Sequence, residues 1–361
     1  MDGILGYINM DNNYLYLIYG MNIMFYFMTS WIFWKKGNDR LSRLVMILMS
    51  ILGIECIKDL FFLGETGYSS ENSWMLVAAI DMVAIPLYAF ILRELCQPGK
   101  LTTREMILHE ISFAIFPLLF VITDNKLFYN IEVAWALTYG IAHAIWAIFA
   151  IPRYNRLLKA TISYDQNVNL GWLRIVLVAF ILILTLWLLN CYVMDLNIEA
   201  FYLAGTMLMW MFICYFIYKH ESVLDELTLT MANEEIEEKN DDTETDLPEI
   251  ERQIQYQFVT QKLFLDPHLR LSDVALKVGT NRTYLSRFFN QEKGHTFYDY
   301  VNGMRLDYAE KLLLTTSDSL AKIAESSGFN SLSTFRRAFA TRHNCSPAEF
   351  RRFHNSQKET E

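Results

Sequence analysis

The stretch SLAKIAESSGFNSLSTFRRAFATRHNCSPAEFRR, residues 319–352, decides the fold of the C-terminal part of this 361-residue chain. Ser319 is a good N-cap for a first helix, and Gly328 permits a left-handed turn after it. Residues 332–342 then form a second helix with two opposite faces. Phe335 and Phe339 lie on the buried face, and Arg336 and Arg337 lie on the exposed face. Two short helices joined by such a turn are typical of a helix-turn-helix, whose second helix enters the major groove of DNA.

An earlier copy of this unit begins with LSDVALKVG, residues 271–279. The two copies share the spacing of a leucine, an alanine and a glycine: Leu271, Ala275 and Gly279, then Leu320, Ala324 and Gly328. Asn281 can cap the following helix, residues 282–291. Between the copies, residues 296–314 predict one helix, which is ~28 Å long at 1.5 Å per residue. This length is near the ~34 Å between successive major grooves on one DNA face, so we expect one chain to read two adjacent grooves.

The flanking residues complete an all-α domain over residues 250–354, followed by a tail at 355–361. A first helix begins at Ile250 and closes at Leu265-Asp266-Pro267. The last helix opens at Ser346-Pro347-Ala348-Glu349, the pattern of a capping box with proline in the first turn. Residues 252–358 hold sixteen basic and nine acidic residues, a net charge of +7 that suits a polyanionic partner.

Residues 256–353 resemble the AraC/XylS family of transcription regulators. The motif that carries the resemblance is Ala309, Leu312-Leu313, Ile323-Ala324, Gly328-Phe329, Phe335, Phe339, Ser346-Pro347 and Phe350-Arg351. The resemblance implies sequence-specific binding to double-stranded promoter DNA and, usually, transcription activation, with RNA polymerase as a partner. Asn344 departs from the family, which usually has glycine there, but asparagine tolerates the left-handed conformation.

The resemblance also implies which residues read the grooves. By position they are Thr283, Ser286 and Arg287 in the first copy and Leu332, Ser333, Arg336 and Arg337 in the second. Helical spacing places Arg282 and Asn290 on the same outward face as Arg287. Arg287 and Arg337 are the candidates for bidentate contacts to guanine, whereas Arg282 and Lys322 are candidates for phosphate contacts.

The other half of the chain is apolar. Hydrophobic residues make up 53% of the whole, and almost all of the excess precedes Lys219. We predict a bundle of about seven transmembrane helices in residues 1–220, because about 20 apolar residues cross a bilayer as a helix. The spans are roughly 14–34, 44–63, 74–96, 105–122, 127–151, 172–194 and 199–219. Familiar members of the resembled family carry a soluble domain instead, so their ligands do not transfer.

The loops between these spans predict their orientation. Basic residues gather in alternate loops: Lys35, Lys36, Arg40, Arg43, Lys100, Arg104, Arg153, Arg156, Lys159 and Lys219. The intervening loops, 64–73, 123–126 and 195–198, contain one lysine in total. Positive residues mark the cytoplasmic side. We therefore expect a multi-pass protein of the bacterial cytoplasmic membrane, with its N-terminus outside and its C-terminal domain in the cytoplasm.

Charged residues inside the predicted spans mark a candidate ligand pocket. They are Glu55, Lys58, Asp59, Asp81 and Glu132, which all fall in the outer half of the bilayer. Such residues are costly in a membrane and usually face the bundle interior. Two interpretations stay open: a polar pocket for a small ligand, and a buried lysine–carboxylate network that only holds helices together. His143 stands apart from these residues and lies deeper in the predicted bilayer, and we interpret it as a packing residue.

An acidic linker, residues 221–249, joins the two halves. Residues 221–251 hold thirteen acidic residues and one basic residue, a net charge of −12 that is typical of a solvated tether. Leu224, Leu227 and Met231 form a short helical seam that could pair two chains in a homodimer.

These features favour a one-component regulator that senses a signal at the membrane. The alternative is a transporter or channel whose cytoplasmic domain reports on its own activity. We predict that the protein is not an enzyme. The chain has no HExxH motif, and no serine and histidine of the predicted spans lie at the same depth in the membrane. Its five cysteines have no CxxC or metal-type spacing, so we expect no metal and no cofactor.

Overall fold

The computed structural model describes residues 12–37, 39–62, 71–164, 170–193, 196–219 and 247–358, which are mainly helical. The described residues divide into two compact units. The bundle unit contains residues 12–152 and 170–219, and the C-terminal unit contains residues 153–164 and 247–358. Most of the predicted acidic linker, with its leucine seam, lies outside the described residues, as do positions 359–361 of the predicted tail.

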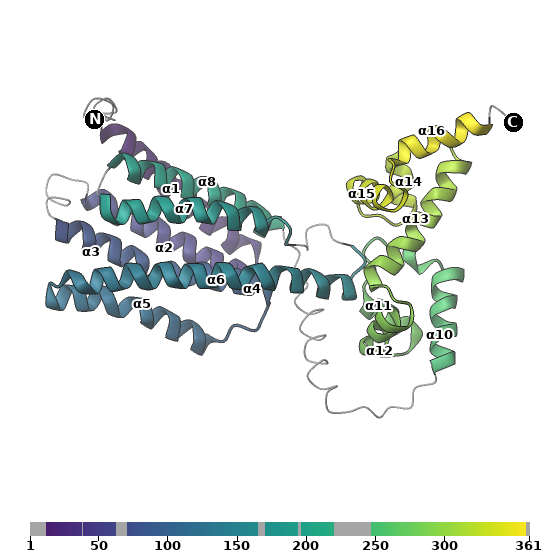
Figure 1. The fold of residues 1–361 in the computed structure, drawn as a ribbon, viewed down its shortest axis with the longest axis horizontal. Helices are drawn as coiled ribbons and strands as arrows, with labels where there is room; N and C mark the ends of the chain where they lie inside the picture. Colours follow the sequence, from purple (N-terminus) through teal and green to yellow (C-terminus); the bar gives the residue numbers. More distant parts are fainter. Residues whose placement is uncertain are drawn as a thin grey trace. The chain divides into compact units, whose positions relative to one another are not determined.

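The bundle unit is a set of long apolar helices (Figure 1). They are α1 (Asn12–Lys36), α2 (Arg40–Phe62), α3 (Glu71–Met82), α4 (Ile85–Cys96), α5 (Thr103–Thr123), α6 (Lys126–Thr161), α7 (Leu173–Val193) and α8 (Leu196–Lys219). Helix α1 packs on α2 and α8, α2 packs on α4, and both α3 and α4 pack on α5. An aromatic core joins α5 and α6 through Phe113, Phe120, Tyr129 and Tyr139.

Six helical stretches of the described chain are long and apolar enough to cross a membrane. They cover residues 14–36, 71–96, 103–123, 126–161, 173–193 and 197–219. The difference from the predicted seven is α2, which is helical as expected but is not among the six. Its first turns carry Arg40 and Arg43, and its last turns carry three further charges, so no long stretch of it is free of charge.

The third predicted span is broken into α3 and α4. The amides of Val83 and Ala84 bond three residues back, to the carbonyls of Ile80 and Asp81, so the helix tightens there. Pro86 follows in the first turn of α4, where its missing N–H is tolerated. The break in regular helix therefore lies just before Pro86.

Apolar side chains cover the outside of the bundle unit as well as its interior. In the most apolar stretch of α5 only 11% of residues are buried. The exposed side chains of this helix include Ile107, Ile111, Leu118, Val121 and Ile122. A contiguous apolar exterior of this kind is unusual for a protein surface in water and is expected of one that faces lipid.

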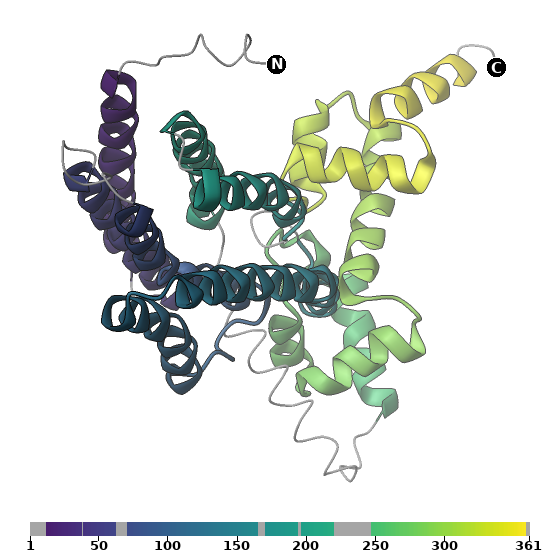
Figure 2. The ribbon, with the colours of Figure 1, turned by 60° about the vertical axis from the view of Figure 1, so that its left-hand side comes forward.

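The C-terminal unit is built around helix α13 (Figures 1 and 2). Its helices are α10 (Leu247–Gln255), the π-helical turn η1 (Tyr256–Thr260), the 3-10 turn η2 (Leu263–Leu265), α11 (Leu271–Val278), α12 (Arg282–Arg287), the π-helical turn η3 (Phe288–Glu292), α13 (Phe297–Thr315), α14 (Leu320–Ser326), α15 (Leu332–His343) and α16 (Pro347–Lys358). The first half of α13 places Phe297 and Val301 in one core, with α11 and α12. Its second half places Ala309 and Leu313 in another core, with α14 and α15.

The helix ends of this unit confirm the predicted caps. Ser319 accepts a hydrogen bond from the amide of Lys322. Ser346 and Glu349 form the capping box, with the Ser346 amide donating to Glu349 Oε2 at 2.8 Å. Asn344 ends α15 in the left-handed conformation, with φ 55°, so its departure from the usual glycine is accommodated.

Candidate DNA-binding surface and bundle cavity

The first helix-turn-helix consists of α11, a turn at residues 279–281, and α12 continued by η3. Gly279 makes the turn with φ +75°, which is the left-handed region that favours glycine. The side chain of Asn281 accepts a hydrogen bond of 2.7 Å from the Tyr284 amide and so caps α12. Leu285 and Phe289 face the core, while Arg287 and Asn290 are exposed on the opposite face.

The second helix-turn-helix repeats this geometry in α14 and α15. Gly328 makes the turn with φ +81°, and Ser331 caps α15 by accepting from the Thr334 amide. Phe335 and Phe339 are fully buried, and Arg336 and Arg337 are exposed. Each copy therefore presents basic side chains from one face of its second helix.

The predicted DNA contacts divide by exposure. Five are exposed on the two second helices: Arg287, Asn290, Ser333, Arg336 and Arg337. Arg282, Thr283 and Ser286 are partly buried, and Ser286 Oγ accepts from Asn290 Nδ2 at 3.3 Å. Leu332 packs partly against the second core, so only part of its side chain faces outward. Lys322, a candidate for phosphate, is exposed and lies 2.9 Å from Asp318.

A buried arginine at the centre of α13 is a feature that the sequence analysis does not single out. Arg305 is 1% exposed, and Nε donates to the Phe264 carbonyl at 2.7 Å. Nη2 donates to the Asp266 carbonyl at 2.5 Å. Burial lowers the pKa of Arg305 to about 10, which still leaves it charged at neutral pH. Its signal in the sequence is its place between Val301 and Ala309, on the apolar stripe of the helix.

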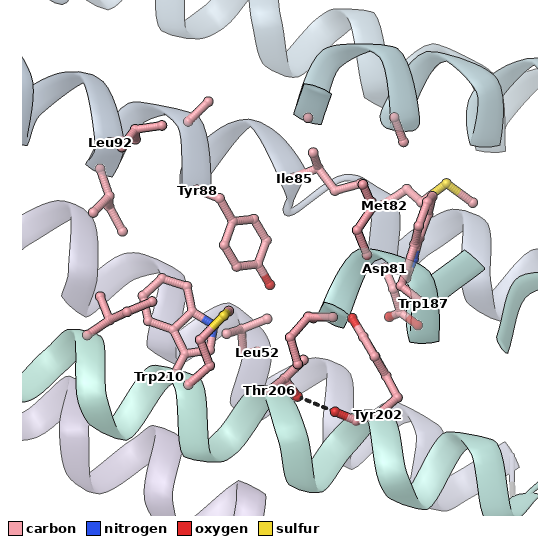
Figure 3. Close-up of a pocket in the computed structure, with 18 of the residues that line it drawn as sticks. Leu52, Asp81, Met82, Ile85, Tyr88, Leu92, Trp187, Tyr202, Thr206 and Trp210 are labelled. Carbon is pink, nitrogen blue, oxygen red and sulfur yellow. Dashed lines mark hydrogen bonds between the residues drawn. The ribbon is translucent and has the colours of Figure 1, made fainter. Parts of the chain in front are cut away.

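The bundle unit contains a cavity of about 280 Å³. Aromatic and acidic side chains share its wall: Tyr26, Glu55, Asp59, Asp81, Tyr88, Trp187, Tyr202 and Trp210. Figure 3 shows Asp81, Tyr88 and Tyr202 directed toward the same space from three different helices. The volume is at the lower end of that of ligand pockets, about 300–1,000 Å³.

Three of the five predicted pocket residues, Glu55, Asp59 and Asp81, line this cavity. Lys58 lies beside it and donates to Asp81 Oδ1 at 2.5 Å, with Asp59 Oδ1 at 3.0 Å. Glu132 does not line it. This glutamate is buried in α6, where neither carboxylate oxygen has a hydrogen-bond partner among the described residues.

His143 does line the cavity, although the sequence analysis interprets it as a packing residue. Its Nδ1 donates to the Tyr139 carbonyl at 2.9 Å, within the same helix. The ring of His143 also packs against those of Tyr139 and His109, with centroids 4.2 and 6.2 Å apart, so its place in the wall is compatible with a packing role.

Two helix-turn-helix modules joined by one long helix, each exposing basic residues on its second helix, define a DNA-binding domain. The helix-turn-helix domain family matches residues 274–352. The "probable transcription factor PqrA" of Proteus vulgaris is 37% identical over 83 residues, which cover 23% of this chain and 68% of that protein. Through this domain the chain belongs to the AraC-type family of transcription regulators.

Other similar proteins match a comparable share of the chain. The "transcriptional activator NphR" of Rhodococcus is 33% identical over 109 residues, which cover 30% of this chain and 32% of that protein. The chain thus spans about a third of the length of that relative. The C-terminal domain of the two-component response regulator yesN from Fusobacterium nucleatum is a similar solved structure. It is 30% identical, covers 28% of this chain and 96% of that chain, and has a TM-score of 0.26.

Proposed function

We propose that this protein is a membrane-tethered transcription activator that binds promoter DNA while its bundle unit remains in the bilayer. The observation that carries the proposal is the joining of two surfaces in one chain. Six apolar helical stretches match the thickness of a membrane, and the domain after them exposes basic side chains for DNA. RNA polymerase is the partner expected of an activator, and a homodimer would present two such domains to one promoter.

The proposed location is the bacterial cytoplasmic membrane, with the N-terminus outside. This orientation needs an odd number of spans, so the proposal includes α2 as the seventh span beside the six apolar stretches. The basic residues of α1 support this orientation, because Lys35 and Lys36 lie in its last turn. In the same way Lys219 ends α8, on the side from which the chain continues toward the DNA-binding domain. DNA is reachable only from the cytoplasm, so the C-terminal domain must lie there.

The proposed signal is a small ligand that enters the bundle cavity. Three carboxylate side chains, Glu55, Asp59 and Asp81, reach its wall, and Lys58 pairs with two of them, Asp59 and Asp81. An acidic excess inside an aromatic wall suits a ligand with a cationic amine and an apolar body. Binding would act by favouring one arrangement of the helices over another.

The function is tested by mapping chromosomal sites that the full-length protein occupies in cells. We expect discrete sites, and we expect an Arg287→Ala/Arg337→Ala variant to lose them. Each arginine that contacts guanine is worth ~1–3 kcal/mol, so the double variant should bind about 30-fold to 10⁴-fold more weakly. The measurement is immunoprecipitation of cross-linked DNA from membranes.

A control variant separates DNA reading from general loss of charge. Lys277→Ala/Lys311→Ala removes two positive charges from α11 and α13, outside the two reading helices. It should keep the same sites with a modest loss of signal, since it weakens only the general electrostatic attraction. Equal occupancy by the wild type and the arginine variant would overturn the assignment of the reading helices.

The membrane topology is tested with paired reporter fusions. We expect alkaline phosphatase to be active when it is fused within residues 64–73 and inactive when it is fused after Lys219. Green fluorescent protein should show the reverse pattern, because each reporter works in one compartment only. Activity of one reporter at both positions would contradict the proposed number of spans.

A further inference from the structure

The C-terminal unit includes a segment from the other half of the sequence. Residues 158–164, here called the clamp segment, are the last turn of α6 and the chain that follows it. Leu158, Ile162, Ser163 and Tyr164 are each at most 4% exposed. From the sequence these residues are expected in a loop of the membrane domain, and nothing in their composition predicts that they are buried.

The clamp segment contacts the entry to the first helix-turn-helix. The amide and the hydroxyl of Ser163 both donate to the Leu269 carbonyl, at 3.1 and 2.8 Å. Ile162 forms an antiparallel β-bridge with Arg270, the residue that caps α11. The ring of Tyr164 lies edge-on to His268, with centroids 5.2 Å apart.

The same residue also contacts the centre of α13. The Ser163 carbonyl accepts from Asn302 Nδ2 at 3.0 Å and from Arg305 Nη1 at 2.8 Å. Its hydroxyl accepts from Arg305 Nη2 at 3.0 Å. Every polar group of Ser163 is thus bonded in a buried site. A buried donor or acceptor that loses its partner is costly, so this arrangement is strongly specified.

Ser163 therefore connects two parts of the DNA-binding domain. These parts also contact each other through η2 and the first hydrophobic core. One part carries the first helix-turn-helix, and the other is the helix that carries the second. The contacts involve positions 268–270, 302 and 305, none of which is a predicted groove reader. The clamp segment thus acts on the relative orientation of the two reading helices without covering them.

We propose that the clamp segment holds the two helix-turn-helix modules in the orientation that reads two adjacent grooves, and that it is the route by which the bundle unit controls DNA binding. The second clause rests on the proposed function. Chain continuity supports it, because the clamp segment is one end of α6. Residues 126–152 of this helix belong to the bundle unit, and some of them line its cavity. The acidic linker then serves as the covalent tether.

Disulfide trapping tests the contact itself, without DNA. Residues paired across an antiparallel bridge have Cα atoms about 4.5–5.5 Å apart, within the range that a disulfide needs. Ile162→Cys/Arg270→Cys in full-length protein in membranes should therefore cross-link on mild oxidation, with Cys345 changed to serine. A protease site placed in residues 233–249 allows detection, since cross-linked halves stay joined after cleavage. The control pair, Ile162→Cys/Lys322→Cys, should separate.

Duplex affinity tests the role of the contact. The probe is a duplex selected from random sequences by the full-length protein in nanodiscs, compared with the same duplex in which one groove site is scrambled. Ser163→Ala/Asn302→Ala should bind the intact duplex at least about tenfold more weakly than the wild type, because two linked contacts no longer act together. Its affinity for the scrambled duplex should stay within about twofold. Thr315→Ala/Ser317→Ala, at the exposed end of α13, is the matched control.

The outcomes are distinguishable. Failure of the first cysteine pair to cross-link overturns the clamp, whatever the DNA result. Cross-linking with an equal loss on both duplexes overturns the orienting role, because it indicates general unfolding. Cross-linking without any DNA binding by the wild type would overturn the proposed function and, with it, the role in control.

Discussion

Replacing Gly328 by alanine is expected to unfold the second helix-turn-helix. A Cβ at this position would lie 2.7 Å from the Phe264 carbonyl oxygen and 2.8 Å from both Cα and the carbonyl oxygen of Leu265. These are backbone atoms, which cannot move aside by changing a rotamer. The left-handed conformation, φ +81°, adds ~1–2 kcal/mol of its own for a residue with a side chain. We expect a total loss above about 4 kcal/mol, a large part of the stability of a domain.

The measurement is the urea concentration at which the C-terminal unit of the full-length protein becomes sensitive to a protease pulse. Two other glycines serve as controls. Gly279→Ala has the same strained conformation, φ +75°, with nothing within 4 Å, so it should cost only ~1–2 kcal/mol. Gly303→Ala lies inside α13 with open space around it and should stabilise by roughly 0.5–1 kcal/mol. Equal losses at Gly328 and Gly279 would show that the close approach to residues 264–265 does not exist.

Replacing Lys58 by methionine is expected to destabilise the bundle unit and change its output. The ammonium group lies within 3.0 Å of Asp59 Oδ1 and 2.5 Å of Asp81 Oδ1, and it also donates to the Val77 carbonyl at 3.1 Å. Methionine keeps the volume but leaves two carboxylates without their cation. Lys58 and Asp81 are partly buried and Asp59 is buried, so the cost is at most the ~3–5 kcal/mol typical of removing one partner of a fully buried ion pair. We expect less of the variant in the membrane and a lower midpoint in thermal unfolding of the detergent-solubilised protein.

A double variant separates a structural role from a signalling role. Lys58→Met/Asp81→Asn removes one of the two orphaned charges and should recover about half of the loss, and the double-mutant cycle measures this coupling. Asp81→Asn alone keeps Lys58 paired with Asp59, so it should reach normal levels. We expect it nevertheless to change transcription from the mapped promoters. Unchanged transcription at normal protein levels would leave the lysine–carboxylate network as a purely structural feature.

The DNA-binding domain could be predicted in detail from the sequence because its signals are local. Ser319, Asn281 and Ser346 cap the helices that immediately follow them, and glycine at 279 and 328 marks the turns. Such features need only the few residues on either side. The π-helical turns at residues 256–260 and 288–292 could not be predicted from the sequence, because such a turn keeps nearly the same spacing of buried residues as an α-helix.

The bundle cavity could be predicted only in part. Charge inside a span is a strong local signal, and it identifies Glu55, Asp59 and Asp81 correctly as neighbours. Which helices face each other is not local information. Glu132 resembles the other acids in sequence but faces elsewhere, and Glu199, which accepts a hydrogen bond from Tyr19, falls at the end of a span and attracts no notice.

The clamp segment also imposes an order on protein synthesis. Ser163 leaves the ribosome 106 residues before Leu269 and 142 residues before Arg305, its partners in the finished domain. Both α7 and α8 are made in that interval. The contact is among the most distant in sequence in the chain, and contacts of this kind form late in folding. A nascent chain that still lacks α7 and α8 therefore cannot close its DNA-binding domain around Ser163. The contacts of Ser163 form only after both helices have been translated.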